Sequence, residues 1–127
     1  MKRLPDSELE LMLIIWNANE AVSRIYIQDR LVKSKELAPT TILSFLSRLE
    51  GKGFLKIEKR GKVNIYSPLV SQEDYVNNES KTILERFFGN SVKNFVVHLN
   101  NSKSVNEKQI QELKEFLDDL PSEDKKE

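Results

Sequence analysis

The sequence predicts a mostly α-helical protein of the α+β class, and three observations support this prediction. Apolar residues recur at intervals of three and four along most of the chain, as they do on one face of a helix. Between residues 54 and 66 the spacing changes to alternation, which is typical of β-strands. The 127 residues are 39% hydrophobic and 31% charged, so we expect a soluble, folded chain of one domain, or of one small domain with an appendage.

Two helices are expected in the first quarter of the chain. The first covers residues 6–18, where Asp6 or Ser7 can serve as the N-cap. The second covers residues 23–34 and begins at Ser23, and Ala21-Val22 just before it could form a short strand. The inward faces are expected to consist of Leu9, Met12, Leu13 and Trp16 in the first helix and of Ile27, Leu31 and Val32 in the second.

A third helix and a β-hairpin follow. The helix begins at Pro39, because a proline at the first helical position lacks an N–H that would need a partner there. Residues 54–59 and 62–66 alternate around Arg60-Gly61, which predicts a hairpin closed by Pro68. Three helices and a hairpin in this order indicate a winged helix-turn-helix domain over residues 1–68. The inward face of the third helix is expected to consist of Ile42, Phe45, Leu46 and Leu49.

The rest of the chain is expected to be helical up to Pro121. A helix over residues 72–88 is broken by Gly89-Asn90, and a short amphipathic helix follows. The motif Ser104-Val105-Asn106-Glu107 has the form of a capping box for a last helix, and residues 122–127 are expected to be a disordered tail. The apolar stripes of these helices consist of Val76, Ile83, Leu84 and Phe87, of Val92, Phe95, Val96 and Leu99, and of Ile110, Leu113 and Leu117.

The charges are unevenly distributed, although the net charge is zero. Residues 1–67 carry 12 basic and 8 acidic side chains, and residues 68–127 carry 8 and 12. Residues 30–66 alone carry 9 basic and 3 acidic side chains. A basic segment around the third helix and the hairpin indicates a surface that faces nucleic acid.

The candidate DNA contacts lie in two groups. On the third helix, small hydroxyl side chains could bond base edges or phosphates, while Arg48 and Lys52 could reach phosphates. At the hairpin tip, three cations surround Gly61, and a phosphate backbone would relieve their mutual repulsion. An ordinary solvated helix face and a solubilising turn are the simpler alternatives. The candidates are Thr40, Thr41, Ser44, Ser47 and Arg48 on the helix and Lys59, Arg60 and Lys62 at the tip.

The composition argues against several classes of function. The chain has no cysteine, which excludes disulfides and thiolate metal sites, and its only histidine is His98. We therefore expect no metal, no cofactor and no enzymatic activity. No apolar run reaches the 18 residues of a membrane span, and the start of the chain turns polar too soon for a signal peptide, so we expect a cytoplasmic protein.

Four segments between residues 4 and 120 resemble the BlaI/MecI/CopY family, the winged-helix repressors of β-lactamase, methicillin-resistance and copper-handling operons. They read LPDSELELMLIIWNANEAVS, LAPTTILSFLSRLEGKGFLKIEKRGKVNIYSP, NSVKNFVVHL and SVNEKQIQELKEFLDDL. The resemblance implies a homodimer that binds a palindromic operator in double-stranded DNA. It places base contacts near Thr40, Thr41 and Ser44, and it implies that the apolar stripes of residues 69–121 form a dimerisation domain.

Two departures from the family pattern matter. Leu43 stands where a basic residue is common, so the operator could differ, and the cysteine pairs of copper-responsive members are absent. The chain therefore resembles the β-lactam-responsive branch, in which proteolysis at an Asn-Phe bond relieves repression. Asn94-Phe95 matches that bond, and a membrane-bound metalloprotease sensor would be the partner. The dipeptide could instead serve packing alone, and a ligand-relieved repressor or a protein-binding adaptor remains an alternative.

Overall fold

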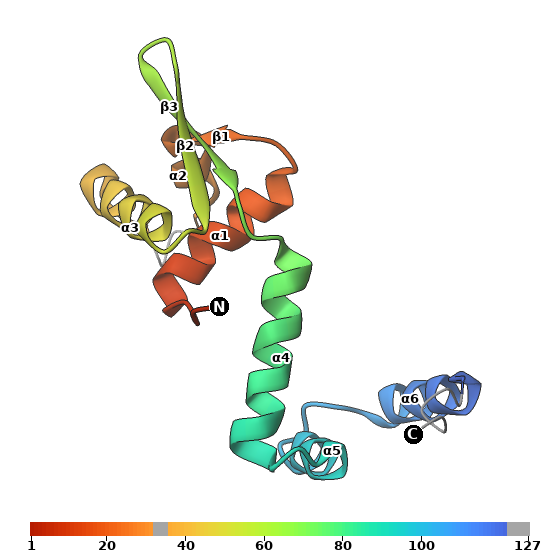
Figure 1. Ribbon diagram of the computed structural model, residues 1–127. Helices are drawn as coiled ribbons and strands as arrows, with labels where there is room; N and C mark the ends of the chain where they lie inside the picture. The colour runs from red at the N-terminus through yellow and green to blue at the C-terminus, as the bar shows by residue number, and fades with distance from the viewer. Residues whose placement is uncertain (32–35, 122–127) are drawn as a thin grey trace. The chain divides into compact units, whose positions relative to one another are not determined.

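The computed structural model describes residues 1–31 and 36–121, which form two compact units, Met1–Ser80 and the part of the chain from Lys81 onward (Figure 1). The fold of the first unit is the expected winged helix. Its elements are α1 (Asp6–Ala18), β1 (Val22–Ser23), α2 (Arg24–Arg30), α3 (Pro39–Gly51), β2 (Leu55–Arg60) and β3 (Val63–Pro68). The helices that follow are α4 (Gln72–Phe88), α5 (Val92–Asn101) and α6 (Glu107–Asp119).

The three strands form one antiparallel sheet in the order β1-β3-β2. Arg60 pairs with Val63, so the hairpin turn consists of only two residues, and Gly61 adopts a φ of 65° that a glycine accepts without strain. The strands start one residue later than expected, and the predicted hairpin is confirmed. It projects beyond the helices that pack at its base (Figure 1). The hairpin is therefore the wing of the domain.

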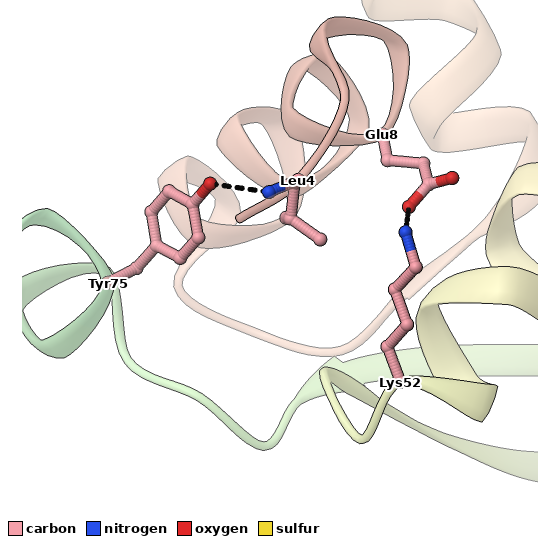
Figure 2. A network of polar contacts seen from close by, with 4 residues as sticks. All are labelled: Leu4, Glu8, Lys52 and Tyr75. Atoms are coloured by element: carbon pink, nitrogen blue, oxygen red, sulfur yellow. Dashed lines mark hydrogen bonds and ion pairs between the residues drawn. The ribbon is translucent and has the colours of Figure 1, made fainter. Parts of the chain in front are cut away.

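The core of the first unit combines α1, α2, α3 and the base of the sheet. Its central side chains are fully buried, and Tyr75 from the start of α4 joins them through ring contacts with Trp16 and Phe54. The backbone N–H of Leu4 donates a hydrogen bond of 2.9 Å to the Tyr75 hydroxyl (Figure 2). The buried apolar residues are Leu4, Leu11, Met12, Ile15, Trp16, Val22, Ile27, Leu31, Ile42, Leu46, Leu49, Phe54, Leu55, Tyr66 and Tyr75.

The bounds of α1 are confirmed, but its predicted inward face is wrong in part. Leu13 is 44% exposed, and Leu11 and Ile15 are buried in its place. The apolar run from Leu9 to Trp16 permits more than one inward face at helical spacing. Packing against α3 buries the face that is shifted by one residue from the predicted face. The N-cap prediction is also wrong, because Pro5 is the N-cap and no side chain caps this helix.

The second helix is confirmed at its start and shorter than predicted at its end. The Ser23 hydroxyl caps α2 by accepting a hydrogen bond from the Tyr26 N–H. Leu31 already has an extended conformation, so the helix ends at Arg30. Val32, which was expected to point inward, lies outside the described residues.

The helices after the wing follow the predicted ranges. Gly89 and Asn90 both have positive φ and end α4 as expected. The predicted capping box is displaced, because Asn106 is the N-cap of α6 and exchanges hydrogen bonds with Gln109 rather than Ser104 with Glu107. In the part of the chain that the structure describes, no helix is long and apolar enough to cross a membrane.

Candidate nucleic-acid interface

Helix α3 is fixed in the first unit by its inner face. Ile42, Leu46 and Leu49 are fully buried, and Phe45 packs against the same core while remaining partly exposed. Pro39 is the first helical residue, and the N–H groups of Thr41 and Ile42 both bond the carbonyl of Ala38. The opposite face of α3 is therefore held rigidly toward solvent.

That outer face carries a stripe of four exposed residues, Thr40, Leu43, Ser44 and Ser47, which we call the α3 outer stripe. They lie at positions i, i+3, i+4 and i+7, so they share one side of the helix. Within the described residues, the hydroxyls of Thr40, Ser44 and Ser47 make no hydrogen bond to the protein. Thr41 is half-buried at the edge of the stripe. The stripe thus offers three small hydroxyls to an external partner.

The two basic residues at the end of α3 have different environments. Arg48 is exposed, and its guanidinium lies 5.6 Å from the centre of the Phe45 ring, so its charge remains accessible. Lys52 instead forms an ion pair with Glu8, with 2.5 Å between Nζ and Oε1 (Figure 2). Because Glu8 is 3% exposed, Lys52 neutralises a buried carboxylate. The expectation that Lys52 reaches phosphate is therefore replaced by a structural role.

The tip of the wing concentrates positive charge. Lys59, Arg60 and Lys62 are all exposed around the turn at Gly61. Lys56 and Glu58, lower on β2, form an ion pair of 3.5 Å, whereas no acidic side chain of the described residues pairs with the three cations at the tip. Their charge is available to an anionic partner, and a polyphosphate backbone presents such charges in a row.

The predicted dimerisation residues lie on α4, α5 and α6, and none of them is buried in the single chain. Phe87 and Val92 are among the most exposed large apolar side chains of the protein. No residue of α5 or α6 is buried at all. Exposed residues of the set are Val76, Phe87, Val92, Phe95 and Leu117, and half-buried ones are Ile83, Leu84, Val96, Leu99, Ile110 and Leu113.

Asn94 and Phe95 lie in the first turn of α5. The Ser91 hydroxyl caps this turn by accepting a hydrogen bond of 3.1 Å from the Asn94 N–H, and the Ser91 carbonyl accepts one from Phe95. The Phe95 ring contacts Phe88 at the end of α4, with 5.1 Å between ring centres, and His98 contacts the same ring. These few contacts are the main restraints on the turn that contains the bond.

Glu8 is the structurally important residue that the sequence reasoning missed. A signal was present, since Glu8 lies three and four residues before Leu11 and Met12 and therefore on the buried stripe of α1. Among the described residues, no cluster of histidine, cysteine or acidic side chains could hold a metal ion.

Comparisons with known proteins agree with this geometry. A family model described as penicillinase repressor matches residues 4–119. The penicillinase repressor of Bacillus licheniformis is 31% identical over 122 residues, which is 94% of each chain, and that of Staphylococcus aureus is 30% identical over 114 residues, 90% of each. The solution structure of the DNA-binding domain of the repressor BlaI is 35% identical and covers 59% of this chain and 94% of its own, with a TM-score of 0.50.

Proposed function

Because the chain belongs to the penicillinase repressor family, a family of DNA-binding transcriptional repressors, we propose that it occupies a palindromic operator as a homodimer. The observation that supports this most directly is that one compact unit carries both the α3 outer stripe and the cationic tip of the wing. One surface offers hydroxyls and the other offers positive charges, and neither set has a hydrogen-bond or ion-pair partner among the residues that the structure describes. Duplex DNA presents base edges and phosphates to match both.

In this proposal α3 enters the major groove and the wing follows the backbone. Thr40, Ser44 and Ser47 are short, so the helix can approach the base edges closely, and Thr41 lies at the margin of the contact. Arg48 bonds phosphate from the far end of the helix. The wing contributes Lys59, Arg60 and Lys62 to phosphates, which adds affinity for any duplex and no sequence preference.

The second unit would supply the dimer. Large apolar side chains on α4–α6 are exposed in the single chain, and burying them against a second copy is favourable by about 25 cal/mol for each Å² of apolar surface. Two linked winged helices then bind two half-sites, and the second contact becomes effectively intramolecular. A two-fold dimer requires a palindromic operator, because each half-site must present the same face.

Repression would end when the bond between Asn94 and Phe95 is cut. A protease cleft needs an extended chain, so α5 has to open locally first, and its first turn depends on the Ser91 cap and one ring contact. Cutting there would separate the winged helix from α6 and most of α5. A membrane-bound metalloprotease sensor would make the cut in the cytoplasm, where a bacterial operator lies.

The wing provides the test of DNA binding. Replacing Lys59, Arg60 and Lys62 together by alanine should weaken binding to every duplex alike. It should also flatten the plot of log K against log salt by up to about 2.7, because each phosphate contact contributes about 0.9 to the slope. The measurement is fluorescence anisotropy with labelled duplex between low and physiological salt.

The matched control replaces three exposed lysines outside the wing, Lys81, Lys108 and Lys114, by alanine. It changes the net charge by the same amount, so it separates a local phosphate contact from a general charge effect. Equal slopes for wild type and the wing variant would contradict a phosphate-contacting wing. If the chain shows no salt-dependent binding to duplex DNA at all, the alternative of a protein-binding adaptor is favoured.

A further inference from the structure

Leu43 is the apolar member of the α3 outer stripe. It is 42% exposed, whereas the neighbouring residue Ile42 is fully buried on the inner face of the same helix. Leu43 therefore contributes little to the core. Its side chain stands among hydroxyls on the surface that the proposed function assigns to the major groove.

Single exposed leucines are common on protein surfaces, so only the position of Leu43 points to a function. Thr40 precedes it by three residues, Ser44 adjoins it, and Ser47 follows four residues later, so all three border it on the helix surface. The stripe contains no charged side chain, so its contacts with DNA would be hydrogen bonds and apolar contacts, both of which base edges accept. In the major groove, the apolar group that a base pair presents is the methyl group of thymine.

We propose that Leu43 is a specificity-determining residue that reads a thymine methyl group in each half-site of the operator. The inference rests on the proposed function, because it requires α3 to lie in the major groove. Contact between the leucine side chain and the methyl removes both from water, and cytosine at that position would leave the leucine against a polar edge without a methyl. Thr40, Ser44 and Ser47 supply hydrogen bonds on either side of this contact.

The test removes the methyl from the DNA and the side chain from the protein. The full-length chain first selects its site from a random duplex library, and each thymine of that site is then replaced in turn by deoxyuridine. This change deletes one methyl and keeps every hydrogen-bonding group. One position in each half-site should weaken wild-type binding by about threefold to fivefold, the effect expected for one methyl group.

The variant Leu43→Ala should lose a similar factor on the unmodified site and should no longer respond to deoxyuridine at that position. The matched control is Leu13→Ala on α1, which removes a leucine that is 44% exposed and should keep the wild-type pattern. A second variant, Leu43→Arg, should shift the base selected at that position toward guanine, the usual partner of arginine in the major groove. Unchanged circular dichroism and thermal midpoint would show that the variants are folded.

The inference is overturned if Leu43→Ala retains the full wild-type response to deoxyuridine, or if no thymine in the selected site is sensitive. Failure of the proposed function would look different, since the wild-type chain would then select no site and show no salt-dependent binding. Loss of the deoxyuridine response in Leu43→Ala, with an unchanged salt slope, supports the proposal.

Discussion

At the scale of single residues, the ion pair between Glu8 and Lys52 links the start of α1 to the residue that caps α3. Burying a carboxylate is costly unless a partner compensates it, and here Lys52 provides both a charge and a hydrogen bond (Figure 2). The two partners are unequally exposed, since Glu8 is buried and the Lys52 side chain is in part accessible to water. The pair therefore positions the C-terminal end of the helix that carries the α3 outer stripe.

Removing one partner or the other should have unequal effects on stability. Lys52→Met keeps most of the aliphatic chain but leaves a buried carboxylate without its partner, so the free energy of unfolding should fall by about 3 kcal/mol. Glu8→Gln leaves a lysine that can turn toward water and an amide oxygen that can still accept its hydrogen bond, so the loss should be about 1 kcal/mol. Urea unfolding of the two variants measures the difference. Equal losses would mean that burial of the carboxylate is not what makes the pair important.

At the scale of elements, α5 is a short helix that is stabilised mainly by its N-cap. It spans ten residues, buries none of them in the single chain, and follows Gly89 and Asn90 with their positive φ. Isolated helices of this length are marginal in water, so its first turn should open far more often than the core unfolds. The Asn94–Phe95 bond lies within that turn, so local opening of the turn would expose the bond to a protease.

Weakening the cap should therefore accelerate cleavage at this bond. Ser91→Ala removes a capping hydrogen bond of about 1 kcal/mol, so the open population and the cleavage rate should rise about fivefold. The probe is thermolysin, with mass spectrometry to follow the Asn94–Phe95 cut. The control is Ser71→Ala, which deletes the equivalent hydrogen bond to Asp74 at the start of α4 and should leave this rate unchanged.

The same bond can be tested in cells that carry the natural operon. Replacing Asn94 by alanine and Phe95 by leucine preserves helix-forming residues and should block induction while repression persists. Immunoblots after addition of a β-lactam follow the full-length protein. If it persists while the target genes are expressed, proteolysis is not the switch, and a ligand or partner must release the operator.

At the scale of the whole molecule, the first unit is proposed to bind DNA and the second unit to form the dimer. The first unit contains the buried core, the α3 outer stripe and the wing, and it extends into α4 because Tyr75 packs on Trp16 and Phe54. The second unit exposes many of its apolar side chains, and none of its described residues, 81–121, is buried in the single chain. We infer that the first unit is stable alone and that the second depends on a partner copy.

A fragment of residues 1–80 should remain folded and monomeric, because it retains Tyr75 and the hydrogen bond from Trp16 to the Val70 carbonyl. Relative to the full chain it should lose about 10²-fold to 10⁴-fold in operator affinity, the range by which linkage of two binding modules exceeds one. Analytical ultracentrifugation and a binding titration measure both effects. A dimeric fragment, or a full chain that stays monomeric, would place the interface elsewhere or remove it.

The sequence by itself determined the order of the elements, the bounds of α1 and α4, and the starts of α2 and α3. Local signals were sufficient for this, because Pro39 begins α3, Ser23 caps α2, Gly61 fits the hairpin turn, and Gly89-Asn90 ends α4. Each of these acts through the conformation of a few neighbouring residues. The candidate DNA contacts on α3 and at the wing tip could be named for the same reason, since exposure there follows from helical and turn geometry.

Only the tertiary structure decided which of several similar local choices was used. The run from Leu9 to Trp16 permits more than one apolar stripe, and contacts with distant elements selected the stripe that includes Leu11 and Ile15. Lys52 could not be separated from the cations proposed to bind phosphate by sequence, because its partner Glu8 is 44 residues away. Helical periodicity reports which residues share a face, whereas burial and ion pairing depend on what the folded chain places against that face.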